Sequence, residues 1–423
     1  MSIINLNALK SAAASACLCI TLSATPLAQG DLTGGVGQFA IQPKREKIVA
    51  SAKPKPVTPK RGPRVSASDR LVEAASRGDS RAASAELGRG ADANARSTEG
   101  CPALVYAAAG KNSETAQALL AKGADANAKC ADGVTALMVA AEVGDAETTR
   151  ALVGRGADAG AKTPDGRTAL IFAASKGQLE VVRVLLAKGA DANARYKDGR
   201  TALTFASANG YAEVARELLE KSAAVDAAGD DGWTPLLWAA WFGHADVVKL
   251  LLERGADVRA RDRDKDTALM KAATQGHVPV VQMLLARGAE ADARGNGGGT
   301  ALLFAASRPS GYEIAEALLA KGADVNARND AGLTPIILAA SYGRVPTLDV
   351  LIEKGADVNA RTPKGFTALI AAANKGLANT VKLLLEHGAD VNARYEDGRT
   401  ALAFAQQNGQ AQVVEILKGA GAQ

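Results

Sequence analysis

The sequence predicts an all-α repeat solenoid, built from stacked helix-turn-helix units with short β-hairpin projections. Apolar residues make up 47% of the 423-residue chain but aromatic residues only 4%. A core filled with large rings is therefore excluded, whereas small apolar residues let helices pack in close layers. Two sequence markers, one built on threonine and one on glycine, recur with the same period. Two markers in one register indicate a single unit repeated along the chain.

The threonine marker opens each unit and the glycine marker ends it. The interval from Thr135 to Thr168 recurs along the chain, except that the step from Thr300 to Thr334 is longer by a single position. The longer step predicts an additional residue around Arg308-Pro309-Ser310. The threonines are Thr135, Thr168, Thr201, Thr234, Thr267, Thr300, Thr334, Thr367 and Thr400, and the glycines are Gly90, Gly123, Gly156, Gly189, Gly255, Gly288, Gly322, Gly355 and Gly388.

One unit can be followed residue by residue. Asp165-Gly166 predicts a tight turn, and Thr168 stands where a helix needs an N-cap hydroxyl. Gly177 separates two stretches with apolar residues at helical spacing. Gly189 is expected to end the second helix in the left-handed conformation. Each unit is therefore predicted to be an L-shaped helix pair with a projecting hairpin.

The unit resembles the ankyrin repeat. Thr234-Pro235-Leu236 and Thr334-Pro335-Ile336 match the family's Thr-Pro-Leu start, and Gly355–Ala360 matches its end. The resemblance covers residues 66–423, about eleven units. It implies a non-catalytic scaffold that binds partner proteins through hairpin tips and the concave face of the first helices. One departure is systematic: apolar residues such as Leu237 replace the family's usual His, so apolar stacking is expected to substitute for it.

The two ends of the array are predicted to be caps. Residues 66–96 lack the Thr-Ala-Leu start, and residues 398–423 stop after a second helix without a hairpin; internal repeats begin at 97. Polar caps are expected because interior units are apolar on both stacking faces.

The segment 1–28 is predicted to be a signal peptide. Lys10 precedes an apolar run of small residues from Ser11 to Ala24, and cleavage is expected after Ala28. The expected location is the periplasm or the outside of a bacterial cell. Cys17 leaves a lipoprotein as the less favoured alternative. No later stretch is apolar for long enough to span a membrane.

Residues 29–65 are predicted to be a Pro- and Lys-rich disordered linker. Eight basic groups face two acidic ones in residues 31–65, while residues 66–423 carry a net charge of −2. Repeated prolines favour an extended, solvated chain. A spacer is the favoured interpretation. The alternative is an adaptor that the linker tethers to nucleic acid or to an anionic envelope polymer.

No pattern predicts a catalytic, cofactor-binding or metal site. His244 and His277 are separated by a single repeat length and so occupy the same repeat position; with His387 they are interpreted as ordinary loop residues, because a metal site needs a third convergent ligand. Cys101 and Cys130 fall in adjacent hairpins, four places out of register. The sequence leaves open whether they form a disulfide.

A ladder of basic residues occupies one position of the hairpins: Arg96, Lys129, Lys162, Arg195, Arg261, Arg294, Arg328, Arg361 and Arg394. A phosphate track and local pairing with acids such as Asp165 and Asp198 both explain it. The net negative charge of the array favours local pairing.

The aromatic residues mark the predicted contact surface for a protein partner. In the unit at 229–261, the position after the turn and the two before the inter-helix glycine hold Trp233, Trp241 and Phe242, which are predicted to be exposed and to form a binding hot spot. Trp238 is assigned to the core. The alternative is that Trp233 stacks on Trp241. The other predicted contact residues of this monomeric chain are Arg200, Asp266, Tyr342, Phe366 and Tyr196.

Irregular positions gather beside that unit. Ser222 and Lys265 replace glycines that are expected to be left-handed, at a cost of up to about 1 kcal/mol each. Residues 196–345 are therefore predicted to be the functional centre.

Overall fold

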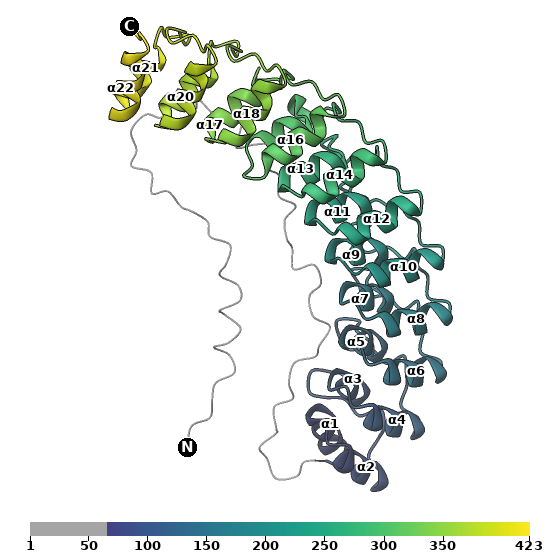
Figure 1. The fold of residues 1–423 in the computed structure, drawn as a ribbon. Coiled ribbons are helices and arrows are strands. Elements are labelled where there is room, and N and C mark those ends of the chain that lie inside the picture. The colour runs from purple at the N-terminus through teal and green to yellow at the C-terminus, as the bar shows by residue number, and fades with distance from the viewer. Residues whose placement is uncertain (1–65) are drawn as a thin grey trace. The chain divides into compact units, whose positions relative to one another are not determined.

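The computed structural model describes residues 66–423, which form 22 α-helices and one 3₁₀ turn, Asn296–Gly298 (Figure 1). The predicted signal peptide and linker lie outside the described residues. Helices alternate with turns in every unit, so eleven helix pairs follow one another along the chain. This confirms the predicted repeat solenoid. No helix among residues 66–423 combines the length and the apolar composition that crossing a membrane requires.

The helices form two layers. Each odd-numbered helix packs on its own even-numbered partner and on the next odd-numbered helix, and the odd-numbered layer follows the inner curve in Figure 1. The inner helices are α1 Ala67–Arg77, α3 Ala103–Ala109, α5 Ala136–Val143, α7 Ala169–Ser175, α9 Ala202–Asn209, α11 Pro235–Phe242, α13 Ala268–Gln275, α15 Ala301–Ala306, α17 Pro335–Ser341, α19 Ala368–Asn374 and α21 Ala401–Gln407. The outer helices are α2 Ser80–Gly88, α4 Ser113–Ala121, α6 Ala146–Gly154, α8 Leu179–Ala187, α10 Ala212–Glu220, α12 Ala245–Glu253, α14 Val278–Ala286, α16 Gly311–Leu319, α18 Val345–Glu353, α20 Ala378–Glu386 and α22 Ala411–Gly419.

The repeated threonines cap the inner helices, as predicted. The Thr168 hydroxyl accepts a hydrogen bond from the Ile171 amide, 3.3 Å away, and satisfies one of the free donors at the start of α7. The same bond forms at Thr135, Thr201, Thr234, Thr267, Thr300, Thr367 and Thr400. Thr334 is the exception: its buried hydroxyl has no hydrogen-bond partner.

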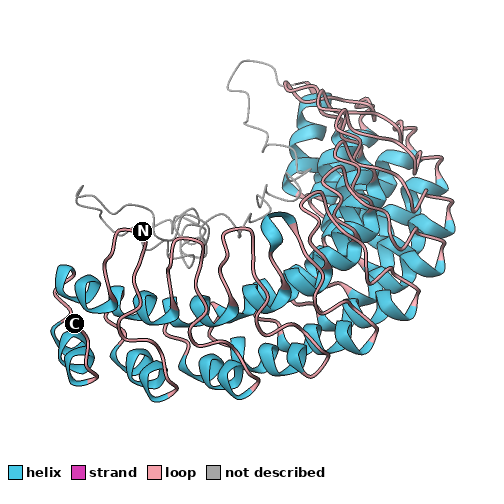
Figure 2. Cartoon of the chain, turned by 90° about the horizontal axis from the view of Figure 1, so that it is seen from above, coloured by secondary structure: helices cyan, strands magenta, loops and turns pink. Residues whose placement is uncertain are grey.

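The projections are tight turns. The loops that carry these turns lie side by side along one edge of the helix layers (Figure 2). In the described part of the chain they contain isolated antiparallel bridges, such as Lys129 with Thr135, and no strand. The predicted β-hairpins therefore reduce to turns closed by a few backbone hydrogen bonds, such as the 2.9 Å bond from the Cys130 amide to the Val134 carbonyl.

Left-handed backbone occurs where the repeat demanded it. Ser222 and Lys265 have φ values of 63° and 61°, which confirms the prediction for both non-glycine replacements. Lys111 also has a positive φ, 54°, which the sequence interpretation missed. It stands at the inter-helix position that holds glycine in most other units.

Apolar stacking takes the place of the missing histidines. Leu237 and Met270, at the position after Thr-Pro-Leu or its equivalent, are 0% and 1% exposed. Alanines such as Ala173 and Ala240 are fully buried between neighbouring inner helices. Because these side chains are small, adjacent units approach closely and the layers need few aromatic residues.

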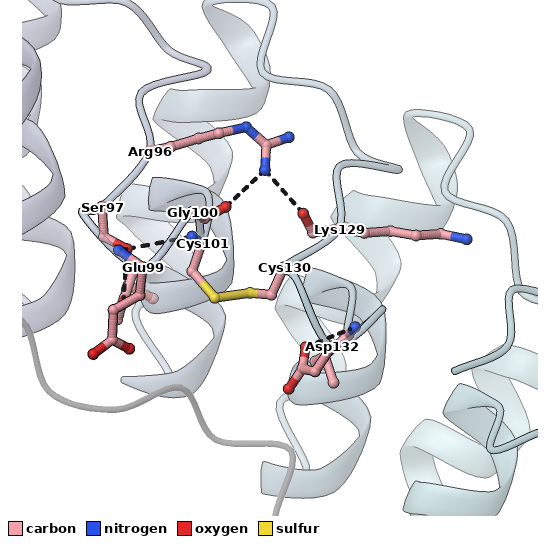
Figure 3. Close-up of a disulfide and its surroundings, with 10 residues drawn as sticks. Arg96, Ser97, Glu99, Gly100, Cys101, Lys129, Cys130 and Asp132 are labelled. Atoms are coloured by element: carbon pink, nitrogen blue, oxygen red, sulfur yellow. Dashed lines mark hydrogen bonds between the residues drawn. A yellow bond between two sulfur atoms is a disulfide. The ribbon is translucent and has the colours of Figure 1, made fainter. Parts of the chain in front are cut away.

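Cys101 and Cys130 form a disulfide between two successive turns, with Cα atoms 4.3 Å apart (Figure 3). Cys101 directly precedes Pro102, the N-cap of α3, whereas Cys130 opens the turn of the next unit. The four-place offset in sequence is therefore the natural juxtaposition of neighbouring turns. Beside the bridge, the Arg96 guanidinium donates to the Gly100 and Lys129 carbonyls over 2.8 and 2.9 Å.

Candidate partner-binding surface

The tryptophans form a packed cluster. Trp233 and Trp241 are only 6% and 8% exposed, so the prediction that they are exposed is wrong. The ring of Trp233 lies 4.7 Å from Trp238 and 5.8 Å from Trp241, and Trp238 stacks on half-buried Phe242 at 6.0 Å. The alternative of intramolecular packing therefore holds, and Trp238 is in the core as predicted.

Residues that follow a turn fold back onto the inner helix of their own unit. Arg200 lies with Cζ 5.2 Å from the ring of Phe205, and Arg399 lies 4.1 Å from Phe404. Trp233 makes the same approach to Trp238. The residue just before each of these N-cap threonines thus packs on the residue four places after the threonine. In the tryptophan unit this packing removes Trp233 from solvent.

The next unit replaces that aromatic pairing with buried charges. Lys271 Nζ lies 2.7 Å from Asp262 Oδ2 and 2.8 Å from Asp266 Oδ2, and the Lys271 and Asp262 side chains are 5% and 1% exposed. The same ammonium lies 4.6 Å from the ring centre of Trp233. Burial raises the pKa of Asp266, while Lys271 opposes that shift. Asp266 is therefore a half-buried member of an ion cluster.

The other predicted contact residues are buried, half-buried or, in one case, exposed. Phe366 is 5% exposed and packs edge-on against Tyr395 at 6.2 Å, so it is buried rather than presented. Tyr196 is half-buried against Phe205, and half-buried Arg200 donates through Nε to Asp198 at 2.7 Å. Tyr342, 44% exposed, is the one predicted contact residue that is exposed.

Tyr342 belongs to a row that follows the inner edge of the array. We define the loop-edge row as the residues eight places after each N-cap threonine, at the ends of inner helices α5 to α21: Val143, Lys176, Asn209, Phe242, Gln275, Arg308, Tyr342, Lys375 and Asn408. All but Val143 are half-buried or exposed. The row contains cations, amides and two aromatic rings but no acid.

Directly beside this row, one side chain in each of several units ties that unit to the preceding one. His244 and His277 direct Nε2 at the Ala208 and Trp241 carbonyls of the preceding unit, at 3.2 and 3.1 Å. Because a carbonyl can only accept, each ring donates. Burial lowers the pKa of His277, which favours this neutral form. Gln178 and Arg344 make the same bond at 3.4 and 3.0 Å.

The arginines of the basic ladder donate hydrogen bonds to backbone carbonyls. Arg328 donates to the Arg361 carbonyl of the next unit at 2.8 Å, and Arg195 donates to Gly199 and Ala228 at 3.1 Å each. The acids instead pair with the arginine two places on, as Asp198 does with Arg200. Local engagement was predicted, but its partners are carbonyls rather than the acids.

Within residues 66–423 no group of three or more His, Cys, Asp or Glu residues is arranged to hold a metal ion. A search of curated proteins finds no match. The family model for ankyrin repeats, described as three copies, matches in eight overlapping windows that together span residues 71–423. Since the matched span exceeds half of the chain and coincides with the stacked helix pairs, this chain belongs to the ankyrin-repeat family.

Proposed function

We propose that this protein is a non-catalytic, monomeric scaffold that binds a partner protein through its inner face, with the loop-edge row and the turn tips as contact surface. Ankyrin repeats are generally protein–protein interaction modules and generally act without catalysis. The observation that carries the proposal is the loop-edge row. It presents half-buried and exposed side chains over successive units, whereas the side chains of the helix layers behind it are buried.

The composition of the row supports a protein partner. Phe242 and Tyr342 supply apolar area, and Gln275 and Asn209 supply adaptable hydrogen bonds. The packing behind the row keeps these residues in place, because the tie residues and the tryptophans hold successive units in register. A rigid surface loses little conformational entropy on binding.

Site-specific photo-cross-linking tests this function. Benzoylphenylalanine replaces Gln275 on the row or, as a control, exposed Arg150 on outer helix α6. After irradiation of producing cells, position 275 is expected to yield a discrete cross-linked protein that position 150 does not. Cross-links from position 150 alone would contradict the proposed surface.

We also propose that the chain is exported to the periplasm or the cell exterior. The disulfide between Cys101 and Cys130 supports this, since disulfides persist in oxidising compartments. Alkylation of free thiols is expected to leave both cysteines unlabelled in the full chain and to label both after deletion of residues 1–28. Equal labelling in the two chains would contradict export.

A further inference from the structure

The loop between α15 and α16 differs from the other inter-helix loops of the array. Pro309 occupies the position of Gly276 and Gly343, whose φ values are 82° and 64°. Proline cannot adopt positive φ, so the chain turns differently: α15 ends at Ala306, and the Gly311 amide bonds the Arg308 carbonyl at 3.1 Å. A Cβ on Gly311 would lie 2.3 Å from the Ala305 carbonyl oxygen. Only glycine fits there, and the loop that carries Arg308 is thus specifically shaped.

Arg308 stands in this loop without an anionic partner. Its side chain is half-buried, and its Nε is buried with no hydrogen-bond partner. Burial lowers the pKa of Arg308, and the charge of Arg344 lowers it further, whereas Tyr342 raises it. Leaving a guanidinium donor desolvated and unpaired is costly. Elsewhere the chain pairs its half-buried arginines, as it does Arg167 with Asp165.

Arg344 brings a second guanidinium to the same loop. Its Nε donates to the Ser307 carbonyl at 3.0 Å, directly before Arg308. No carboxylate pairs with either arginine among the described residues. Glu313, the first acid after Arg308 in the chain, is engaged by the Tyr312 hydroxyl. The charges of the two guanidinium groups repel each other, and an anion bound by both would remove this repulsion.

We propose that Arg308 and Arg344 bind a carboxylate side chain in an acidic segment of the partner protein, while Tyr342 packs on the adjacent part of that segment. Guanidinium groups bind carboxylates through paired N–H donors, and arginine with tyrosine is typical of interface hot spots. The whole loop-edge row carries three cations and no acid, so none of its side chains repels an acidic segment. This inference rests on the proposed function and specifies its ligand.

A displayed library of random 12-residue peptides tests the site on the full chain. Three proteins are screened: wild type, the double variant Arg308→Gln/Arg344→Gln, and the control Arg150→Gln on α6. Glutamine removes charge without removing the tie, because Gln275 and Gln178 already occupy the equivalent positions in other units. Thermal unfolding of the double variant is expected to match wild type and shows that it folds.

Wild type and Arg150→Gln are expected to enrich peptides containing Asp or Glu, and the double variant to lose that enrichment. Changing Glu to Gln in an enriched peptide is expected to weaken binding about tenfold or more. Equal enrichment of acid-free peptides by all three proteins would overturn the acidic ligand but leave the binding scaffold standing. Absence of any enrichment would overturn the proposed carboxylate site at Arg308 and Arg344. The photo-cross-linking from position 275 tests the proposed scaffold function independently of this result. A phosphoserine peptide that bound more tightly than its Glu counterpart would assign the site to phosphate and overturn the carboxylate.

Discussion

Two regions of the array, the tryptophan cluster in the unit at 229–261 and the loops at 307–344, use their distinctive residues in opposite ways. In the first, Trp233, Trp238 and Trp241 are buried against one another and against Lys271. In the second, Arg308 lacks a hydrogen bond at Nε and Tyr342 is exposed. The difference teaches that aromatic content alone does not mark a contact surface: the tryptophan rings bury one another, whereas Arg308 is a charged donor without an anionic partner and Tyr342 stays exposed.

The largest expected effect is on the tryptophan cluster. Trp238→Ala should lower the free energy of unfolding by about 3–5 kcal/mol, because it leaves a cavity among Trp233, Leu237 and Phe242. Trp238→Phe should change it little, since Phe172 and Phe205 fill the same repeat position and the unpaired indole N–H is removed. Urea unfolding followed by circular dichroism measures both. A tolerated alanine would mean that the cluster is not structural.

The ion cluster should respond almost as strongly. Lys271→Met leaves Asp262 buried without its cation and should cost roughly 3 kcal/mol. The double change Asp262→Tyr/Lys271→Phe should recover most of this loss, because Tyr196 with Phe205 fills the same two positions in another unit. The same urea experiment measures the recovery. A double variant no more stable than Lys271→Met would contradict the interchange of ionic and aromatic pairs.

A smaller effect concerns the tie residue His277. Burial lowers its pKa in the folded chain, so the unfolded chain binds the proton more readily. The stabilisation is therefore present above the unfolded pKa of about 6.5 and is lost as the pH falls. His277→Gln should flatten the decline in melting temperature between pH 7.5 and pH 5. The control His387→Gln changes an exposed residue and should leave the decline as it is; equal flattening in both variants would be inconsistent with a role for His277.

The smallest effect on stability is expected in the loops. Arg308→Gln should leave the melting temperature unchanged or slightly raised, because it removes an unpaired cation that Arg344 repels. Differential scanning calorimetry measures the melting temperature of this variant and of the comparison variant Lys176→Gln. The comparison variant loses the ion pair of row residue Lys176, whose Nζ lies 3.7 Å from Glu142 Oε1. A marked loss of stability in Arg308→Gln would show that Arg308 has a structural partner.

The fold was predictable because each unit carries its own capping and turn residues: Thr168, Gly177 and Gly189 act as their positions in the repeat imply. The contact surface was only partly predictable. Comparing the repeats with one another identified the positions of Trp233 and Phe366 but not their burial. Trp233 is buried by Trp238, four places beyond the N-cap, and Phe366 packs against Tyr395 in the turn of the next unit. Arg308 was not among the predicted contact residues, although the extra residue and Pro309 marked its loop. Its missing partner shows only when neighbouring units are assembled.

Hydrogen–deuterium exchange on the complex with the cross-linked partner tests the central claim most directly. Binding is expected to protect the inter-helix loops at 307–311 and 341–345 and to leave the outer helices unchanged. Protection confined to outer helices such as α6 and α8, with the loops at 307–345 exchanging as in the free protein, would contradict the account.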